Sequence, residues 1–283
     1  MIGLDIINIG YKMKVSLIIA VYKNIKALDL IIKALKLQTY KNFEVVIVED
    51  CEDISMSNYI KTITTLEVIH TTQEDIALRK ARSQNNGIIA STGEYLIFID
   101  GDCIPYSTFI ENHIKLSQEN TVLSGRRVNL NEKVTKKIFN NDITPFEIEK
   151  KYFLQLDLIF DKSVKYEQGI CINPDSFIYK KFLHKEKRNT DILGCNFSCF
   201  KKDFVEINGF DEGYQGTALS DDTDLTWRFQ AYGLELKSCK NAANVFHLWH
   251  NVIDRGSAKE EIKLMLKNKE MNKFICKNGL NTH

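Results

Sequence analysis

The stretch EYLIFIDGDC, at residues 94–103, joins a strand pattern to two acids and decides how the rest of the chain is interpreted. The apolar run at 95–99 has the length and composition of a buried strand, and Asp100, Gly101 and Asp102 follow it directly. Carboxylates at a strand end are oxygen ligands for hard divalent cations, and open α/β sheets bind their ligands at this edge. The simpler alternative is an Asp-Gly turn, so the neighbouring segments have to decide.

Strand-like and helix-like segments alternate through the first hundred residues, which predicts a parallel sheet with crossover helices. The expected strands are VSLIIAV at 15–21, FEVVIV at 43–48, and shorter runs at 66–70 and 95–99. The expected helices lie at 25–37, 55–64 and 76–89. Because the carboxyl ends of parallel strands meet at one edge, Glu49 and Asp50 should line one crevice with Asp100 and Asp102, on neighbouring strands.

The second half of the chain is less regular. We expect a helix at 107–120, a strand at 121–128 and irregular or helical cover at 129–190. The sequence then predicts helices at 202–208 and 225–232, strand character at 234–246 and an amphipathic helix at 258–277. The fold class is therefore α/β, with a mostly parallel, Rossmann-like central sheet flanked by helices.

The composition is that of an ordinary globular protein and excludes several classes of function. The chain has 283 residues, of which 44% are hydrophobic and 27% charged. Its 38 basic and 37 acidic residues leave a net charge of +1, which offers no field for a nucleic-acid partner. We find no secretory signal and no apolar stretch of about 18 residues, so we expect neither secretion nor a membrane span.

Seven cysteines are an odd number, and their spacing is that of neither a disulfide framework nor a zinc site. Cys195 and Cys199 form the one close pair. We expect reduced thiols that behave as small buried apolar residues in a cytoplasmic protein.

Four ordered motifs resemble one enzyme family. They are VSLIIAVYKN at 15–24, VVIVED at 45–50, ARSQNNGIIASTGEYLIFIDGDC at 81–103 and GCNFSCFKKDFVEINGFDEGYQGTALSDDTDLTWRFQAYG at 194–233. Together they resemble the inverting GT-A glycosyltransferases of family 2, with a second half similar to the galactosyltransferase-type (family 7-like) region of chondroitin-polymerase-like enzymes. The resemblance implies a GT-A domain at 14–250, with a nucleotide-sugar-binding half at 14–128, an acceptor half at 129–250 and a helical tail at 251–283.

The resemblance also implies how the two acids at 100–102 act. A sugar nucleotide carries a diphosphate whose negative charge grows as the sugar leaves, and a carboxylate-held Mn²⁺ or Mg²⁺ neutralises that charge. Asp102 is the expected metal ligand. Asp100, with Gly101 beside it, is expected to reach the ribose hydroxyls or the water shell of the metal.

Further residues are expected to contact the nucleotide. Glu49 and Asp50 resemble the family's acids that position the uracil base, and Ala20 and Tyr22 follow the first strand where the family contacts the base. Arg82 is expected to approach the diphosphate, although the family's Ala-Arg-Asn pattern is interrupted after it. The structural alternatives are a turn or cap for the two acids, core packing for Tyr22 and a solvated helix face for Arg82.

Inversion requires a general base on the acceptor side. Asp222 is the expected base, because it occupies the Asp position of the family's Glu-Asp-x-Glu motif. Asp221 and Asp224 are the flanking acids expected to face the sugars, and Asp221 is one methylene shorter than the family's Glu. Acids at a helix start also have a structural interpretation, since they stabilise the helix dipole.

Two later motifs complete the expected site. His247 closes the strand-like segment at 234–246, and either His247 or His250 is expected to complete the metal site. Cys195 and Asn196 lie in the segment that shapes the donor-sugar pocket in the family.

The predicted activity is metal-dependent, inverting transfer of a sugar from UDP-Gal, UDP-GalNAc or UDP-GlcNAc to a glycan acceptor, in capsule, lipopolysaccharide or other surface polysaccharide biosynthesis. A sugar-nucleotide pyrophosphorylase is one alternative, but the glycine-rich signature it needs after the first strand is absent. A non-catalytic nucleotide-sugar-binding protein is the other. The lysine-rich helix at 258–277 either packs on the domain or makes a peripheral contact with the inner face of the cell membrane, where lipid-linked acceptors lie.

Overall fold

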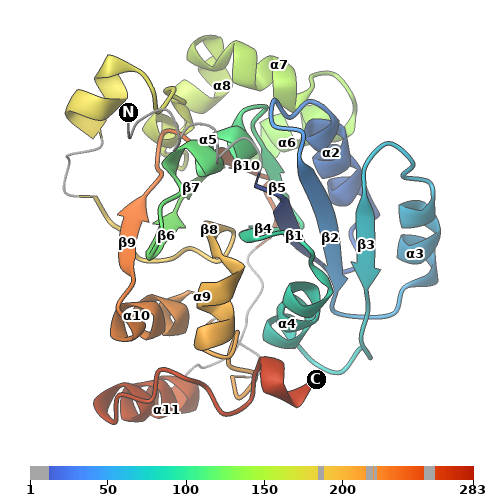
Figure 1. The fold of residues 1–283 in the computed structure, drawn as a ribbon. Coiled ribbons are helices and arrows are strands. Elements are labelled where there is room, and N and C mark those ends of the chain that lie inside the picture. Colours follow the sequence, from blue (N-terminus) through green and yellow to red (C-terminus); the bar gives the residue numbers. More distant parts are fainter. Residues whose placement is uncertain (1–12, 184–187, 215–218, 220–221, 252–258) are drawn as a thin grey trace.

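The computed structural model describes residues 13–183, 188–214, 219, 222–251 and 259–283. A seven-stranded sheet spans the molecule in the order β3-β2-β1-β4-β8-β6-β9, and a three-stranded sheet has the order β5-β10-β7 (Figure 1). The large sheet comprises β1 Val15–Val21, β2 Phe43–Glu49, β3 Val68–Thr71, β4 Tyr95–Asp100, β6 Thr121–Ser124, β8 Asn196–Phe200 and β9 Glu235–Ser238. The small sheet comprises β5 Cys103–Pro105, β7 Arg126–Asn129 and β10 Asn244–His247.

Helices lie on both faces of the large sheet, and others cover the small sheet. The helices are α2 Ile25–Lys36, α3 Ile54–Lys61, α4 Lys80–Ala90, α5 Phe109–Leu116, α6 Glu132–Phe139, α7 Pro145–Lys150, α8 Leu156–Ile159, α9 Lys201–Glu206, α10 Thr223–Tyr232 and α11 Lys259–Glu270. Shorter turns of helix are η1 Tyr152–Leu154, η2 Tyr166–Gly169, η3 Tyr179–Leu183 and η5 Leu280–Thr282. None of the helices within the described ranges has the length and apolar character needed to cross a membrane.

The predicted parallel half of the sheet is confirmed, with β1 at its centre. Because successive side chains of a strand point to opposite faces, Leu17 packs into one hydrophobic core with α2 and Ile18 into the other with α4. The register sets Val21 beside Glu49 and Ala20 beside Asp100. Both acid-bearing strand ends therefore lie at one edge, but β1 separates them, so the prediction that they are neighbouring strands is wrong.

Two predicted strands are each divided between the two sheets. The run at 121–128 splits at Gly125 into β6 and β7, and the run at 234–246 splits into β9 and β10. Gly125 has no room for a side chain, since a Cβ there would lie 2.3 Å from the Asn196 amide. Between β9 and β10 the chain turns through Asn241, which has a φ of +64°. A periodicity of two does not reveal such a change of sheet.

Several helices are shorter than predicted, and their ends have local causes. The helix expected at 76–89 begins at Lys80, because the amide of Arg79 donates to the Asp50 carboxylate at 2.8 Å instead of continuing the helix backwards. The helix expected at 258–277 ends at Glu270, and Asn272 follows with a φ of +51°.

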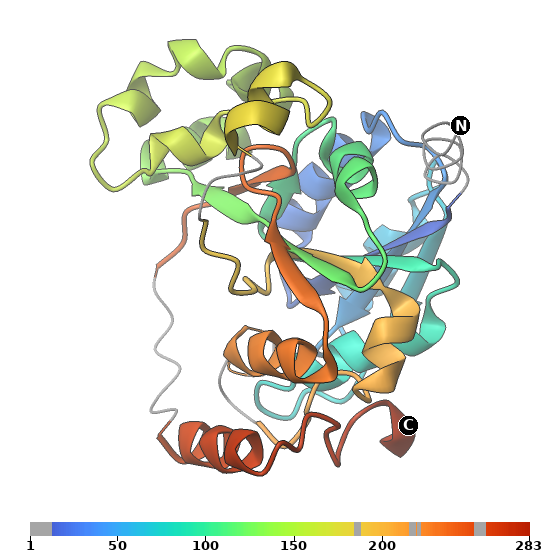
Figure 2. The ribbon, with the colours of Figure 1, turned by 60° about the vertical axis from the view of Figure 1, so that its left-hand side comes forward.

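Residues 132–183 form a helical cap on the small sheet, which confirms the prediction of helical or irregular cover (Figures 1 and 2). Tyr152 and Tyr166 stack with ring centroids 4.5 Å apart, and each hydroxyl donates to the backbone carbonyl of the other residue. Tyr152 also lies 6.3 Å from the ring of Phe246 on β10. The cap is thereby fixed to the strand that ends in His247.

Glu44 on β2 gives the first testable prediction. Its buried carboxylate accepts from Ser16 at 2.6 Å and from the amide of Thr92 at 2.6 Å, and it pairs with Lys14 at 2.9 Å. Burial by itself would raise the pKa of Glu44, but these partners lower it to about 2. The stabilisation is therefore fully present above the ordinary glutamate pKa of 4.5 and is lost as the pH falls towards 2.

We expect Glu44→Gln to lower the free energy of unfolding by about 1–3 kcal/mol at pH 7, because the amide leaves buried donors unmatched. Urea denaturation between pH 7 and 2.5 measures this, and the difference from wild type should shrink over the acid part of that range. Glu67→Gln is the matched control, since Glu67 also binds Lys14 but is 59% exposed. Equal effects of the two substitutions would contradict this account.

Candidate active site

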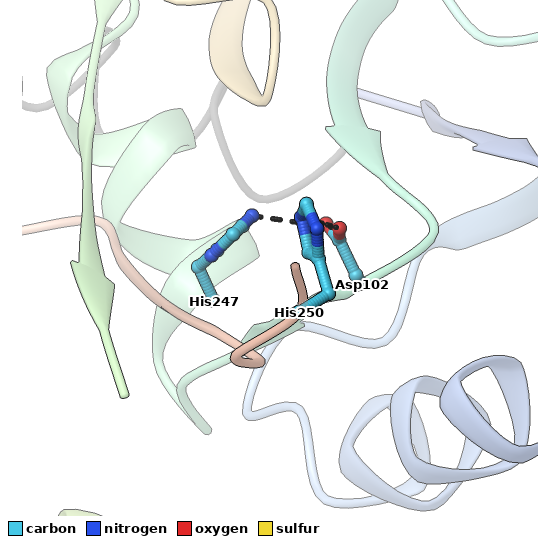
Figure 3. A group of neighbouring side chains, drawn as sticks. All are labelled: Asp102, His247 and His250. Atoms are coloured by element: carbon cyan, nitrogen blue, oxygen red, sulfur yellow. Dashed lines mark ion pairs between the residues drawn. The ribbon is translucent and has the colours of Figure 1, made fainter. Parts of the chain in front are cut away.

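Asp102, His247 and His250 converge at the junction of the two sheets. The Nε2 atom of each histidine lies 3.4 Å from Asp102 Oδ2, and the ligand atoms of all three residues lie within 4.8 Å of one another (Figure 3). Among the described residues, this is the one group of three or more such side chains close enough to hold a metal ion. The sequence expected one of the two histidines, and the structure brings both.

Strand pairing explains this convergence. β5 and β10 are antiparallel, and Cys103 pairs with His247. The amide of Leu248 then donates to the carbonyl of Asp102 at 3.0 Å, which extends the pairing to the turn after β4. Asp102 and His247 therefore come from two backbones that are held in register, and His250 follows three residues later.

The charge of Asp102 suits a cation site. Burial would raise the pKa of Asp102, but the hydrogen bond from His247 and the neighbouring charge of both imidazoles lower it to about 2. The carboxylate is therefore ionised at neutral pH. One carboxylate and two imidazoles form a donor set that suits Mn²⁺ better than Mg²⁺, which prefers oxygen ligands.

Asp100 lies at the same edge but has a different partner. Lys80, the first residue of α4, places its Nζ 2.5 Å from Asp100 Oδ1. Gly101 is needed for packing, since a Cβ there would come within 2.8 Å of the Ala20 carbonyl. The structure thus separates the two acids, with Asp102 facing the histidines and Asp100 facing a lysine that the sequence analysis missed. Lys80 directly precedes the Ala-Arg pair of the motif at 81–103, which was the available signal.

The two acids after β2 are hydrogen-bonded within the protein. The buried Glu49 accepts from His70 Nε2 at 3.0 Å and from Cys51 Sγ at 3.2 Å. Asp50 accepts from Gln73 Nε2 at 2.5 Å and from the Arg79 amide at 2.8 Å. These contacts hold the segment before α4 against the sheet edge. The predicted contact of Glu49 and Asp50 with a base would require some of them to open.

Tyr22 and Arg82 take up different environments. Tyr22 is 53% exposed at the carboxyl edge of β1, so core packing does not account for it. Its hydroxyl donates to Asp75 Oδ1 at 3.3 Å. Arg82 points to Glu212, with Nη1 3.5 Å from Oε2, and the predicted approach of Arg82 to a diphosphate stays a prediction.

Arg127 on β7 is a second residue that the sequence analysis missed. Its Nη1 lies 3.9 Å from Cys195 Sγ. Burial would lower the pKa of Arg127, but the neighbouring thiols together with Asp100 and Asp102 raise it above the ordinary value. Arg127 therefore supplies fixed positive charge beside the two acids. The sequence shows it only as one of two arginines within an expected strand.

On the acceptor side, Asp222 is the N-cap residue of α10 and is partly exposed. The amide of Gly194 donates to its Oδ1, which ties the acid to the segment before β8. Asp221 lies outside the described residues. This hydrogen bond places Asp222 beside the residue that directly precedes Cys195 and Asn196 in the chain, and the donor-sugar role of these two residues stays a prediction.

Asp224 is part of the core, which argues against its predicted contact with sugar. Its carboxylate accepts from Tyr214, Trp227 and Arg228, at 3.1, 2.9 and 3.2 Å. Both members of the Asp224–Arg228 ion pair are 1% exposed. A helix-start acid whose i+3 and i+4 neighbours carry donors is satisfied locally, and the sequence already contained that spacing.

Cys195 and Asn196 are also buried. The Asn196 amide donates to the carbonyls of Arg126 and Ala243, at 2.9 and 2.8 Å, and its oxygen lies 3.1 Å from His113 Nε2. Asn196 thus links β8 to β7 and to Ala243, the residue directly before β10. Six of the seven cysteines are buried, which confirms the prediction that they behave as small buried apolar residues.

Comparison with known proteins gives the class that this fold and site define. The model of the family "Glycosyl transferase family 2" matches residues 16–202, and "N-terminal domain of galactosyltransferase" matches residues 177–251. The chain belongs to glycosyl transferase family 2. It is therefore a glycosyltransferase, and its α/β architecture is that of the GT-A enzymes.

Among curated relatives, an uncharacterised glycosyltransferase of Rickettsia conorii is 34% identical over 113 residues, which are 39% of this chain and 18% of that protein. The putative glycosyltransferase EpsH of Bacillus subtilis is 33% identical over 114 residues, which are 38% of this chain and 32% of that protein. The chain thus aligns with about a fifth to a third of the length of these relatives.

Solved structures share the fold at low identity. S. aureus TarS 1–349 in complex with UDP-GlcNAc has a TM-score of 0.62 and 15% identity, over 95% of this chain and 69% of that one. GalNAc-T7 with UDP, GalNAc and Mn²⁺ has a TM-score of 0.57 and 15% identity, over 84% of this chain and 44% of that one.

The buried ion pair gives a second testable prediction. Asp224→Ala leaves the Arg228 guanidinium buried without the carboxylate that pairs with it. We therefore expect the free energy of unfolding to fall by about 3–5 kcal/mol. Urea denaturation followed by circular dichroism measures this. If the variant unfolds at the same urea concentration as wild type but loses turnover, Asp224 would instead be assigned to the sugar-binding site.

Proposed function

We propose that this glycosyltransferase transfers a sugar from a nucleotide sugar to a glycan acceptor, with inversion and with a bound divalent metal. The observation that carries the proposal is the convergence of Asp102, His247 and His250 at the carboxyl edge of the parallel strands. Nucleotides of open α/β folds bind at this edge. In this proposal residues 14–128 bind the nucleotide sugar and residues 129–250 bind the acceptor.

Asp102, His247 and His250 are the proposed metal ligands, and Mn²⁺ is the proposed ion because proteins with this fold were solved with it. A divalent ion held by these residues would act as a Lewis acid and would neutralise the charge that develops on the diphosphate when the sugar leaves. Arg127 and Lys80 supply further positive charge at the same edge. GalNAc-T7 and the mannosyltransferase of Pyrobaculum calidifontis were both solved with Mn²⁺, which supports this choice.

Asp222 is the proposed general base. It removes the proton from the acceptor hydroxyl as the hydroxyl oxygen attacks the anomeric carbon. The amide of Gly194 holds its carboxylate in one orientation, so the base does not have to be ordered during the reaction. A non-catalytic nucleotide-sugar-binding protein would need neither this base nor the metal ligands, and all of them are present.

A uridine donor is proposed, with galactose or an N-acetylhexosamine as the transferred sugar. The match to a galactosyltransferase domain and the UDP-sugar complexes of TarS and GalNAc-T7 support this donor class. The acceptor is proposed to be a growing surface glycan such as capsule or lipopolysaccharide, built at the cytoplasmic face of the membrane.

The metal ligands give the third testable prediction. We expect Asp102→Asn and His247→Ala each to reduce metal-dependent release of UDP from the donor by more than about 100-fold, because even a lost partner of a ligand costs 10–100-fold. Mn²⁺ binding measured by electron paramagnetic resonance should weaken in parallel. Asp29→Asn is the control, since Asp29 pairs with Lys33 on α2. Full turnover of Asp102→Asn, or turnover that EDTA does not reduce, would refute the assignment.

The proposed general base, Asp222, gives the fourth testable prediction. We expect Asp222→Asn to lower kcat by about 10²–10⁴-fold, the usual contribution of a general base. Mn²⁺ affinity and the KM for the donor should change little, because Asp222 does not belong to the metal cluster. Steady-state kinetics on a panel of UDP-sugars with a glycan acceptor separate the two quantities. A variant with wild-type kcat would mean that another group accepts the proton.

A further inference from the structure

The helical cap carries an unusual concentration of exposed apolar side chains. Eight of the 21 large apolar residues that are exposed in the described parts of the chain fall within residues 153–182. Seven of them, each 54–78% exposed, define what we call the apolar patch: Phe153, Leu154, Leu156, Phe160, Phe177, Ile178 and Phe182. Apolar side chains gathered in this way commonly mark a surface that meets a partner.

The patch is the outer surface of a folded unit. Tyr152, Leu158, Val164 and Tyr179 alternate with the patch residues in the sequence and are each no more than 8% exposed. Their burial anchors the cap to the small sheet, with Tyr152 stacked on Tyr166. Other side chains thus already fill the core of the cap, and the residues of the apolar patch stay exposed to solvent.

The charges around the patch are uneven. The acids of residues 145–183 each have a partner within the protein: Glu147, Glu149, Asp157, Asp161, Glu167 and Asp175. Five of the six lysines in the same range are exposed and form no ion pair within the described residues: Lys150, Lys151, Lys162, Lys165 and Lys181. Glu147, Glu149 and Asp161 accept their hydrogen bonds from neutral groups and keep their charge, so five unpaired lysines face three unpaired acids and this surface has a positive surplus.

We propose that the outward face of residues 150–182 docks on an anionic lipid bilayer. Phenylalanine and leucine side chains enter the boundary of the acyl chains, while lysine ammonium groups reach lipid phosphates. A protein partner fits this surface less well, because protein interfaces favour Trp, Tyr and Arg and are poor in Lys. Residues 145–183 contain neither Trp nor Arg.

This surface differs from the membrane contact that the sequence suggested. The cap and α11 lie at opposite ends of the molecule in both views (Figures 1 and 2), so they are two separate surfaces. The charges of α11 are mixed, because Glu260 and Glu261 lie in its first turn and Glu260 pairs with Lys263 at 2.7 Å. The cap, in contrast, packs on β10, the strand that ends in His247. Docking of the cap would therefore hold the proposed metal site in a fixed orientation relative to the membrane.

A vesicle flotation assay on the full chain tests the proposal without any need for activity. The probes are vesicles of phosphatidylcholine alone and vesicles of phosphatidylcholine with about 30% phosphatidylglycerol. The salt concentration is about 0.1 M, at which surface charges still act over about 10 Å. We expect wild type to float with the anionic vesicles, and less so as salt increases. The variant Phe153→Ser/Leu154→Ser/Phe160→Ser should bind at least tenfold more weakly, and so should Lys150→Glu/Lys151→Glu.

The matched control is Ile262→Ser/Leu264→Ser/Leu266→Ser on α11, which should float like wild type. Circular dichroism and donor hydrolysis should be unchanged in all three variants, so a failure of the proposed activity is recognised separately. The proposal is overturned if wild type ignores anionic vesicles, or if the α11 variant and not the cap variants lose binding. It is equally overturned if sedimentation shows that the patch instead joins two copies of the chain and that vesicles do not compete for it.

Discussion

The pairing of β5 with β10 is the constraint on which the site depends. It places Cys103 opposite His247, two residues that are 144 positions apart, and so sets both histidines against Asp102. The same strand continues the small sheet through β7, where Arg127 lies, and supports the helical cap through Phe246. A shift of one residue in this register would turn His247 to the other face of the sheet, because side chains alternate.

The acids at the sheet edge are divided between structure and chemistry by what surrounds them. Glu49 and Asp50 accept hydrogen bonds from their own chain, and Asp224 is enclosed with Arg228. Asp102 lies 3.4 Å from two imidazoles, a type of side chain that can also bind metal ions. Burial of a carboxylate is costly unless donors satisfy it, so the supply of donors at each position separates these roles.

Much of the fold could be predicted because its parallel half is built from local signals. The strands at β1, β2 and β4 are continuous apolar runs, and short connections with helical spacing leave few topologies open. The divided strands could not be predicted, since Gly125 and Asn241 break a run without changing its apolar pattern. The roles of Lys80 and Arg127 were also hidden, because each acts on a residue far away in the sequence.

The sequence by itself determined the class of fold, the edge of the sheet where the acids meet, and membership of a glycosyltransferase family. These follow from periodicity and from motifs whose residues are close together in the chain. The tertiary structure alone decided that both His247 and His250 reach Asp102, that Asp100 belongs to Lys80, and that Asp224 is part of the core. Which side chains meet depends on distances across the sheet. These distances are fixed only by the register of strands that are far apart in the sequence, and no local sequence pattern gives that register.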